Sequence, residues 1–228
     1  MIRYHITDRV QTIIRRMTTL LIILLFCTSL WQLMAAGWIQ GKAIVAQQLL
    51  DHSWQKTLSS SRDGDDDSDN GNDDYKTRNH KPWPWADTWP VAKLTVPRLG
   101  VDQIVVAGDS GSSLAFAPGH SYASAEPGDN GLTMISAHRD THFRFLQDLV
   151  IDDSLHLQSR DKTTIFRVTH FQVVDSTNYT LTTQLEENIL VLVTCYPFDA
   201  ITSGGNERFL VFATEHRTEH QAKDKYRT

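Results

Sequence analysis

Three residues that can do chemistry together lie at the ends of apolar, β-type runs. Cys195 ends the run 189–195 and is followed by Tyr196 and Pro197, and His138 ends the run 132–138. Proline cannot donate a hydrogen bond to a neighbouring strand, so the strand that carries Cys195 is predicted to end there. Arg208 opens the last apolar run. The sequence therefore predicts one thiol, one imidazole and one guanidinium at the ends of three strands.

This trio has the chemistry of a cysteine enzyme that acts on an amide bond. A free thiol is only slightly ionised at neutral pH, so a neighbouring imidazole or cation is needed to activate it. Histidine can protonate a leaving amine and later deprotonate an incoming one. The fixed fork of an arginine can stabilise an oxyanion or hold carbonyl groups of a substrate. We interpret Cys195 as the nucleophile, His138 as the acid and base, and Arg208 as the stabilising cation.

Each of the three residues also has a plain structural interpretation. A cysteine at a strand end is often an inert core residue, a lone histidine is often a surface residue, and an arginine that opens a strand is often solvated. Other polar residues are candidates for the same site. His120, after a Pro-Gly turn, and Thr194 are possible substrate-groove residues, although a structural role is favoured for His120. His142 is expected beside the site without acting as the base, and His170 is expected to face solvent.

The remaining pattern predicts an all-β domain. Short apolar runs separated by Gly, Pro, Asp and Asn clusters are typical of a barrel or sandwich, here of about 130 residues. One helix is expected near residues 140–149, with Asp140 or Thr141 as its N-cap and Phe143, Leu146 and Leu149 on its buried face. The predicted strands are 92–96, 103–106, 132–137, 154–158, 163–174, 189–195 and 209–214.

The N-terminal part predicts a membrane anchor. Residues 17–41 carry no charge, and the apolar stretch 18–40 has the length of a membrane-spanning helix. Four arginines precede it, so the positive-inside rule places residues 1–17 in the cytoplasm and the rest of the chain outside. A cleaved signal peptide is the alternative, but the apolar stretch is longer than the core of most signal peptides.

Between the anchor and the β domain the composition changes twice. Residues 41–58 have helical spacing, and their apolar face is expected either on the lipid surface or packed on the domain. Residues 59–84 are rich in aspartate and are predicted to be a disordered linker. Part of this linker resembles a calcium-binding loop, but Thr77 stands where such a loop needs glutamate, so no metal is predicted. Trp83, Trp85 and Trp89 are expected to be buried where the catalytic domain, 85–216, begins, and residues 217–228 form a tail.

The motifs resemble those of sortases. Val193-Thr194-Cys195 is similar to the end of the sortase Thr-Leu-x-Thr-Cys signature, 135–139 resembles the strand of the catalytic histidine, and Arg208 opens the strand after the cysteine. The segments 117–120 and 127–128 also resemble the region ahead of that strand. The resemblance covers residues 85–215. It implies an eight-stranded β-barrel that cleaves a Leu-Pro-x-Thr-Gly-like signal between Thr and Gly through a Cys195 thioester, without a cofactor.

The anchor, the acidic linker and residues 82–89 are similar to sortases of Gram-negative, often marine, proteobacteria. This likeness implies a single-pass protein of the inner membrane with a periplasmic catalytic domain. Its partners would be a secreted protein that carries a C-terminal sorting signal and an amine acceptor that the sequence does not identify.

Several other classes of function fit less well. A net charge of −5 and no basic cluster after the first sixteen residues argue against nucleic-acid binding. Papain-like enzymes place the cysteine before the histidine, and the Ser-x-Gly-Cys segment of L,D-transpeptidases is absent. A tethered β-barrel that binds a partner and carries an inert Cys195 remains open, and thiol reactivity separates it from an enzyme. A disulfide between Cys195 and Cys27 is discounted, because Cys27 lies in the apolar stretch.

Overall fold

A computed structural model describes residues 2–62, 80–182, 187–200 and 204–216, with the backbone alone at 2–13, 35–44 and 61–62. The chain divides into two compact units, Met1–Val45 and Ala46–Thr228. Each unit is described by itself below.

The first unit consists of the N-terminal part of the helix α1, Ile2–Arg62. Within it, Ile14–Met34 is long and apolar enough to cross a membrane, and its side chains are exposed. This segment overlaps the predicted span over residues 18–34. An apolar helix of spanning length near the N-terminus, as expected for a single-pass anchor, is therefore present.

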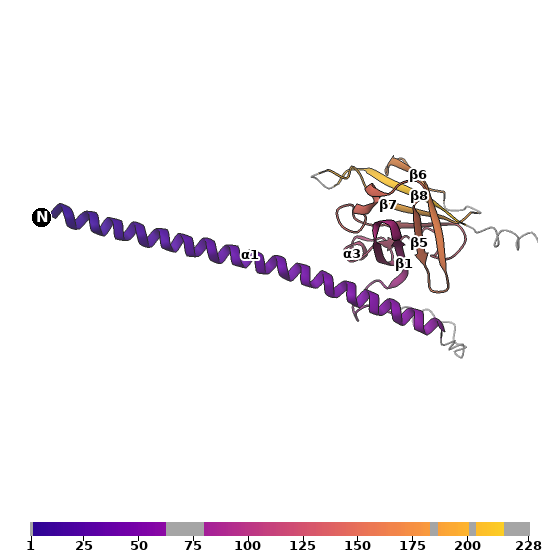
Figure 1. Ribbon diagram of the computed structural model, residues 1–228, viewed down its shortest axis with the longest axis horizontal. Helices are drawn as coiled ribbons and strands as arrows, with labels where there is room; N and C mark the ends of the chain where they lie inside the picture. The colour runs from indigo at the N-terminus through magenta and orange to yellow at the C-terminus, as the bar shows by residue number, and fades with distance from the viewer. Residues whose placement is uncertain (1, 63–79, 183–186, 201–203, 217–228) are drawn as a thin grey trace, which may run out of the picture. The chain divides into compact units, whose positions relative to one another are not determined.

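The second unit is built on a closed barrel, in which the described residues form eight strands in the order β1-β2-β3-β4-β7-β8-β6-β5 (Figure 1). The neighbours pair antiparallel except for β2 with β3 and β4 with β7, which are parallel. This confirms the predicted eight-stranded barrel. The strands are β1 (Pro90–Val96), β2 (Val101–Ala107), β3 (Gly119–His120), β4 (Leu132–Ser136), β5 (Ser154–Gln158), β6 (Thr163–Asp175), β7 (Ile189–Cys195) and β8 (Glu207–Glu215).

Short helical elements connect the strands. They are η1 (Pro97–Leu99), α3 (Gly111–Leu114) and η2 (Arg144–Asp148). The helix predicted over residues 140–149 is only the short 3-10 helix η2, and neither Asp140 nor Thr141 caps it. The carboxylate of Asp140 instead accepts hydrogen bonds from Arg139, so it is not available as a cap. The three residues predicted on the buried face, Phe143, Leu146 and Leu149, are buried.

Two apolar clusters lie on opposite faces of the strands β4, β7 and β8. The inner cluster fills the barrel, and the outer cluster covers its outside. Because side chains alternate along a strand, successive residues of β7 belong to different clusters. From these strands, the inner cluster takes Ile135, Ala137, Leu190, Leu192, Val211 and Ala213. The outer cluster contains Leu132, Val174, Val191, Leu210 and Phe212, with Met134, Tyr179, Leu181, Ile189 and Val193 beside them.

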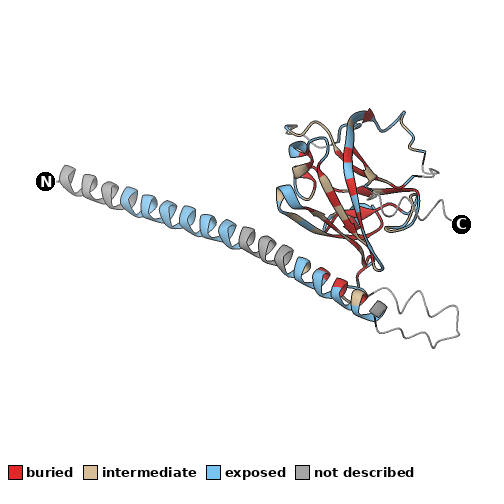
Figure 2. Cartoon of the chain, turned by 45° about the vertical axis from the view of Figure 1, so that its right-hand side comes forward, coloured by how far each residue is buried: buried red, intermediate tan, exposed pale blue. Residues whose placement is uncertain are grey.

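The C-terminal end of α1 packs on the barrel. Leu50 and Trp54 are fully buried against Ile104, Val106 and Ala117, and Figure 2 shows the buried residues of α1 toward this end. Of the two expectations for the helical stalk, packing on the domain is therefore the one observed. Residues 63–79, most of the predicted linker, lie outside the described residues.

The three tryptophans at the start of the domain are not all buried as predicted. Trp83 and Trp89 are partly buried, and the Trp83 ring packs edge-on against Phe116 with 5.1 Å between the ring centroids. Trp85 is 80% exposed, so the prediction of its burial was wrong. The apolar surface beside this segment is already covered by Leu50 and Trp54 of α1, which the local sequence pattern did not reveal.

Candidate active site

The strand register brings Cys195 and Arg208 together. Cys195 is the last residue of β7, and Arg208 lies directly opposite it on the antiparallel strand β8. Side chains that are directly opposite in an antiparallel pair share one face of the sheet, with their Cβ atoms about 5 Å apart.

The parallel pair β4–β7 brings His138 to the same place. Ser136 pairs with Val193, and the backbone N–H of Ala137 donates to the carbonyl of Val193 at 3.1 Å. His138 follows two residues after the end of β4 at Ser136, and the same register, continued over these two residues, would bring it level with Cys195.

All three side chains belong to the outer face of the barrel. Cys195 alternates in phase with Val191 and Val193, which belong to the outer cluster. The same alternation places Arg208 with Leu210 of β8 on this face. His138 is likewise in phase with the outer-cluster residues Leu132 and Met134 of β4.

The three groups differ in exposure and in contacts. Cys195 is a free thiol and is half-buried, whereas His138 is exposed. Arg208 is partly exposed, and its Nη1 donates to the carbonyls of Gly205 (2.7 Å) and Glu207 (2.9 Å). Its guanidinium is therefore held at the start of β8, next to the end of β7.

A further charged residue, Arg139, lies in the same region, although the sequence pattern predicted it only as part of a polar turn. Arg139 follows His138 and is only 7% exposed. Its Nε donates to Oδ1 of Asp140 at 2.9 Å, and its Nη1 and Nη2 donate to the carbonyls of Pro197 (2.5 Å) and Ala200 (3.0 Å). Its position directly after His138 is a sequence signal that could have singled it out.

These contacts also shift the pKa values of Arg139 and Asp140. The hydrogen bond from Arg139 holds the pKa of the Asp140 carboxyl below its ordinary value, against the opposing effect of desolvation. The hydrogen bond to Asp140 raises the pKa of Arg139, against the opposing effect of desolvation. The charged guanidinium reaches the connection that begins at Cys195, through the carbonyls of Pro197 and Ala200.

Comparison with known protein families shows to which family the chain belongs. The sortase domain matches residues 94–216, which is more than half of the chain and includes β4, β7 and β8. The chain belongs to the sortase family. Sortase D of Bacillus subtilis (strain 168) is 29% identical over 120 residues, which are 52% of this chain and 60% of that protein. The chain thus spans less than two thirds of this relative's length.

Solved structures support the same fold. The sortase resembles a Clostridium perfringens Sortase D5 transpeptidase with a TM-score of 0.56 and 20% identity, over 76% of this chain and 99% of that one. It also resembles the pilus-related Sortase C of Group B Streptococcus, with a TM-score of 0.51 and 24% identity, over 57% of this chain and 69% of that one. At these identities the likeness concerns the fold.

His142 lies near the site of the sortase but in a different setting. It is partly buried, and burial together with the charge of His138 lowers its pKa. Its backbone carbonyl accepts a hydrogen bond from Nε2 of Gln103 at 2.9 Å. Because a lowered pKa keeps its imidazole neutral, it is a poor candidate for the proton donor.

Neither of the two possible groove residues faces the side of the barrel that carries Cys195. Thr194 is buried on the inner side, and its hydroxyl donates to the carbonyl of Ala137 at 2.8 Å. His120 is fully buried and pairs with Ile135 of the inner cluster. Its Nε2 lies 2.9 Å from the carbonyl of Ala125. Both residues therefore have structural contacts in the described part of this sortase.

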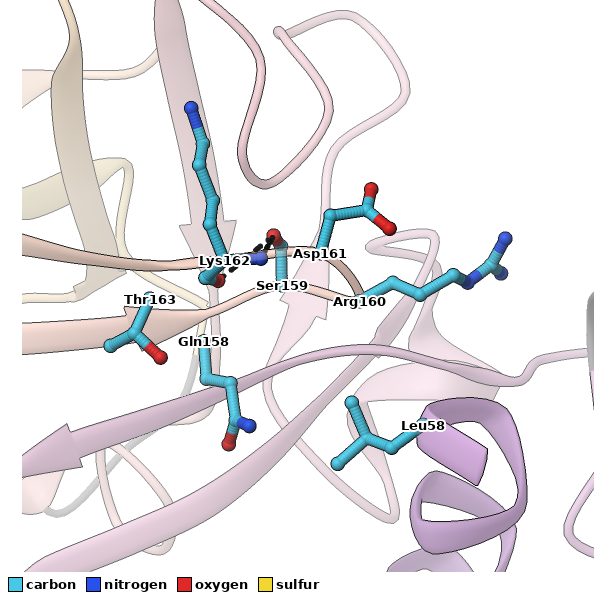
Figure 3. Close-up of a pocket in the computed structure, with 7 residues that line it drawn as sticks. All are labelled: Leu58, Gln158, Ser159, Arg160, Asp161, Lys162 and Thr163. Carbon is cyan, nitrogen blue, oxygen red and sulfur yellow. Dashed lines mark hydrogen bonds between the residues drawn. The ribbon is translucent and has the colours of Figure 1, made fainter. Parts of the chain in front are cut away.

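Two hollows in the described surface of the sortase have no Cys195, His138 or Arg208 in their lining, although His120 lines the second one. A hollow of about 420 Å³ is lined by Leu58 of α1 and by the turn between β5 and β6 (Figure 3). Since β6 runs parallel to β7, this turn lies at the barrel end opposite to Cys195. In Figure 3 the side chains of Arg160 and Lys162 point away from one another, and the Ser159 hydroxyl bonds to the backbone of Lys162. No group of three or more His, Cys, Asp or Glu side chains suited to a metal occurs among the residues described.

Proposed function

We propose that this protein is a membrane-anchored sortase transpeptidase with Cys195 as the nucleophile. One observation carries the proposal, the register of β4, β7 and β8. It places Arg208 opposite Cys195 and leads the end of β4, which His138 follows, toward the end of β7. A nucleophile, an acid–base group and a cation on rigid strand ends are the parts that acyl transfer through a thioester requires.

In the proposed reaction the Cys195 thiolate attacks the carbonyl carbon of threonine in a Leu-Pro-x-Thr-Gly-like signal. The tetrahedral intermediate collapses as the Thr–Gly bond breaks, and protonated His138 gives its proton to the leaving amine of glycine. The acyl group then remains on Cys195 as a thioester. An incoming amine attacks the carbonyl carbon of this thioester and gives a proton to His138. The C–S bond then breaks, so Cys195 leaves as a thiolate and the acyl group is released as a new amide.

Arg208 has donors left for the substrate. Both of its hydrogen bonds to the described residues come from Nη1, so its Nε and Nη2 are not engaged among these contacts. These groups can donate to the developing oxyanion or to a carbonyl of the substrate backbone. This is the role that we propose for Arg208.

The surface beside Cys195 supports an apolar recognition sequence. Met134 and Val193 on the strands, and Tyr179 and Leu181 from the β6–β7 connection, are only partly buried on the outer face. Partly buried apolar side chains that adjoin a reactive group favour an apolar ligand such as Leu-Pro. We propose that the signal lies along this face.

The apolar helix supports the proposed location. With four arginines before the span, we propose that residues 1–17 are cytoplasmic and that the catalytic domain lies outside. Assignment to the inner membrane of a Gram-negative bacterium rests on the resemblance of the anchor and linker. The substrate would then be a secreted protein, and the acceptor an amine of the cell envelope.

Trapping the thioester tests this function. Full-length protein in detergent is incubated with a Leu-Pro-x-Thr-Gly peptide and analysed by mass spectrometry. An adduct on Cys195 is expected, and hydroxylamine should release it as a hydroxamate. The Cys195→Ala variant is the matched control, because Cys27 then remains as the only other thiol. Cleavage of the peptide by Cys195→Ala at the wild-type rate would exclude this mechanism, and an unreactive wild-type thiol would favour a binding module.

A further inference from the structure

The Arg139 side chain connects two segments that both lead to the proposed active site. Its backbone directly follows His138, and its guanidinium reaches the carbonyls of Pro197 and Ala200, just after Cys195. Those carbonyls belong to the connection between β7 and β8, which begins at Cys195 and ends at Arg208. One side chain thus contacts the segments that carry all three proposed site residues.

The burial of this guanidinium sets it apart from a surface ion pair. The Arg139 side chain is 7% exposed, whereas its carboxylate partner Asp140 is 70% exposed. Water screens the charge of Asp140 much more than that of Arg139. A buried arginine is stable only when its donors are satisfied, and four hydrogen bonds achieve this here.

We propose that Arg139 is a positioning residue of the sortase site: it holds the β7–β8 connection, which begins at Cys195, against the His138 segment. The proposal rests on the proposed function of Cys195 and His138. It assigns Arg139 no contact with the substrate.

Arg139 lies within a set of neighbouring charges. Its guanidinium interacts with the carboxylates of Asp140 and Asp199. The other charged groups around the pair are His138 and Arg144, which act on Asp140, and Arg208, which lies opposite Cys195.

Two variants, Arg139→Met and Arg139→Lys, separate the charge of Arg139 from its hydrogen bonds. Methionine removes the charge and the hydrogen bonds, whereas lysine keeps a charge but cannot donate to Asp140 and two carbonyls in a planar fork. The exposed Arg144 supplies the matched control, Arg144→Met. All variants are made in full-length protein with Cys27→Ser, so that Cys195 is the only thiol.

The first measurement is the time course of Cys195 alkylation by iodoacetamide, which needs no sorting peptide. In both Arg139 variants the alkylation rate should depart from the wild-type rate, because the connection that begins at Cys195 is no longer held by the guanidinium. The second measurement is peptide cleavage. Here kcat/KM should fall about 10²-fold in both variants, because small displacements of reacting groups have costs of this size. Arg144→Met should stay within about twofold in both assays.

Two results would overturn the proposal. One is a folded Arg139→Met protein with the wild-type alkylation curve and wild-type kcat/KM. The other is an Arg139→Lys protein with unchanged kcat/KM. This result would exclude a positioning role for the Arg139 fork even if Arg139→Met does not fold. If the wild type cleaves no sorting peptide, the proposed function fails, and the alkylation curves still decide whether Arg139 holds the connection that begins at Cys195.

Discussion

At the scale of single residues, Cys195 combines access with positive neighbours. Its thiol is half-buried at a strand end, with Arg208 opposite and Arg139 close by. Structural cysteines are usually enclosed by apolar side chains, whereas reactive cysteines lie in partly exposed, electropositive surroundings. The half-buried position of Cys195 opposite Arg208 is consistent with the role that we propose for it.

The choice of acid and base can be tested among neighbouring histidines. His138→Ala should lower kcat by about 10²–10⁴-fold, the usual contribution of general acid–base catalysis. His142→Ala and His120→Ala should keep most of the activity if folded, and Arg208→Lys should be severely impaired because lysine lacks the planar fork. Steady-state cleavage of a sorting peptide measures these effects. An inactive His142→Ala beside a fully active His138→Ala would reverse the assignment of the base.

An ion pair outside the site, between the exposed Arg98 and the buried Asp153, predicts how stability depends on pH. The Asp153 side chain is buried and accepts Nε and Nη2 of Arg98 at 2.5 and 2.6 Å. The Arg98 hydrogen bond, aided by the backbone N–H of Val150, lowers the pKa of Asp153 below its ordinary value of 3.8. A carboxyl with a lowered folded pKa stabilises the fold above its unfolded pKa, and this stability is lost as the pH falls through the folded value.

Asp153→Asn should therefore destabilise the protein most at pH 6, and its difference from the wild type should shrink as the pH falls below about 3.8. Denaturant unfolding of the full chain between pH 6 and pH 3 measures this difference. Asp161→Asn, at an exposed position, makes the same chemical change and is the control. A destabilisation by Asp153→Asn that stayed constant over this range would show that the ionised pair contributes nothing.

At the scale of elements, the parallel pair β4–β7 is the decisive contact. Its ladder joins Leu132 to Ile189 and continues to Ser136 and Val193. Beyond the ladder, the Thr194 hydroxyl bonds to the carbonyl of Ala137, immediately before His138. This bond extends the pairing to the residue before the proposed base.

Thr194→Val removes this bond at nearly constant volume. The loss of one buried hydrogen bond should lower the free energy of unfolding by about 1 kcal/mol. It should also lower kcat more than it changes KM, because the bond positions His138 and Thr194 does not face the substrate side. Denaturant unfolding and steady-state kinetics measure the two effects.

Thr133→Val is the control for this variant. Thr133 is buried on β4, and its hydroxyl has no hydrogen bond among the described contacts of this strand pair. A rise in KM at constant kcat for Thr194→Val would instead favour a direct contact of Thr194 with the substrate.

At the scale of the whole molecule, the helix α1 belongs to both units. Its N-terminal part holds the apolar segment Ile14–Met34, and its C-terminal end contributes Leu50 and Trp54 to a buried cluster on the barrel. The end of the stalk is therefore part of the folded domain. Removal of residues 1–80 would expose Ile104, Val106 and Ala117 of this cluster.

Trp54 tests this arrangement. Trp54→Ala should destabilise the catalytic domain by about 3–5 kcal/mol, the usual cost of deleting a buried tryptophan side chain. Trp85→Ala makes the same change at an 80% exposed position and should cost no more than about 0.5 kcal/mol. Denaturant unfolding of the full chain measures both. Equal stability of the two variants would show that α1 does not pack on the barrel in solution.

The orientation of the anchor is a separate prediction. The arginines at positions 3, 9, 15 and 16 precede the apolar segment, so the C-terminus should lie outside the cytoplasm. A reporter enzyme that is active only outside the cytoplasm, fused after Thr228, should be active. A reporter that requires the cytoplasm should be inactive at the same position, and the opposite pattern would invert the topology.

Much of the fold follows from local sequence patterns. A continuous apolar run and a following proline determine where β7 ends, and β5 has the bounds that its pattern predicts. The strand β3, Gly119–His120, was not predicted because two residues cannot show alternation. The residue types alone also determine which chemistry Cys195, His138 and Arg208 could share.

Only the tertiary structure decided which strand ends meet. His138 and Cys195 are brought level by a parallel pairing between strands far apart in the sequence, and no local pattern encodes such a register. The same holds for Arg139 and Trp54, whose burial depends on Pro197 and Ala200 in one case and on β2 in the other. Burial and pairing are properties of contacts between distant segments, so they exist only once the chain has folded.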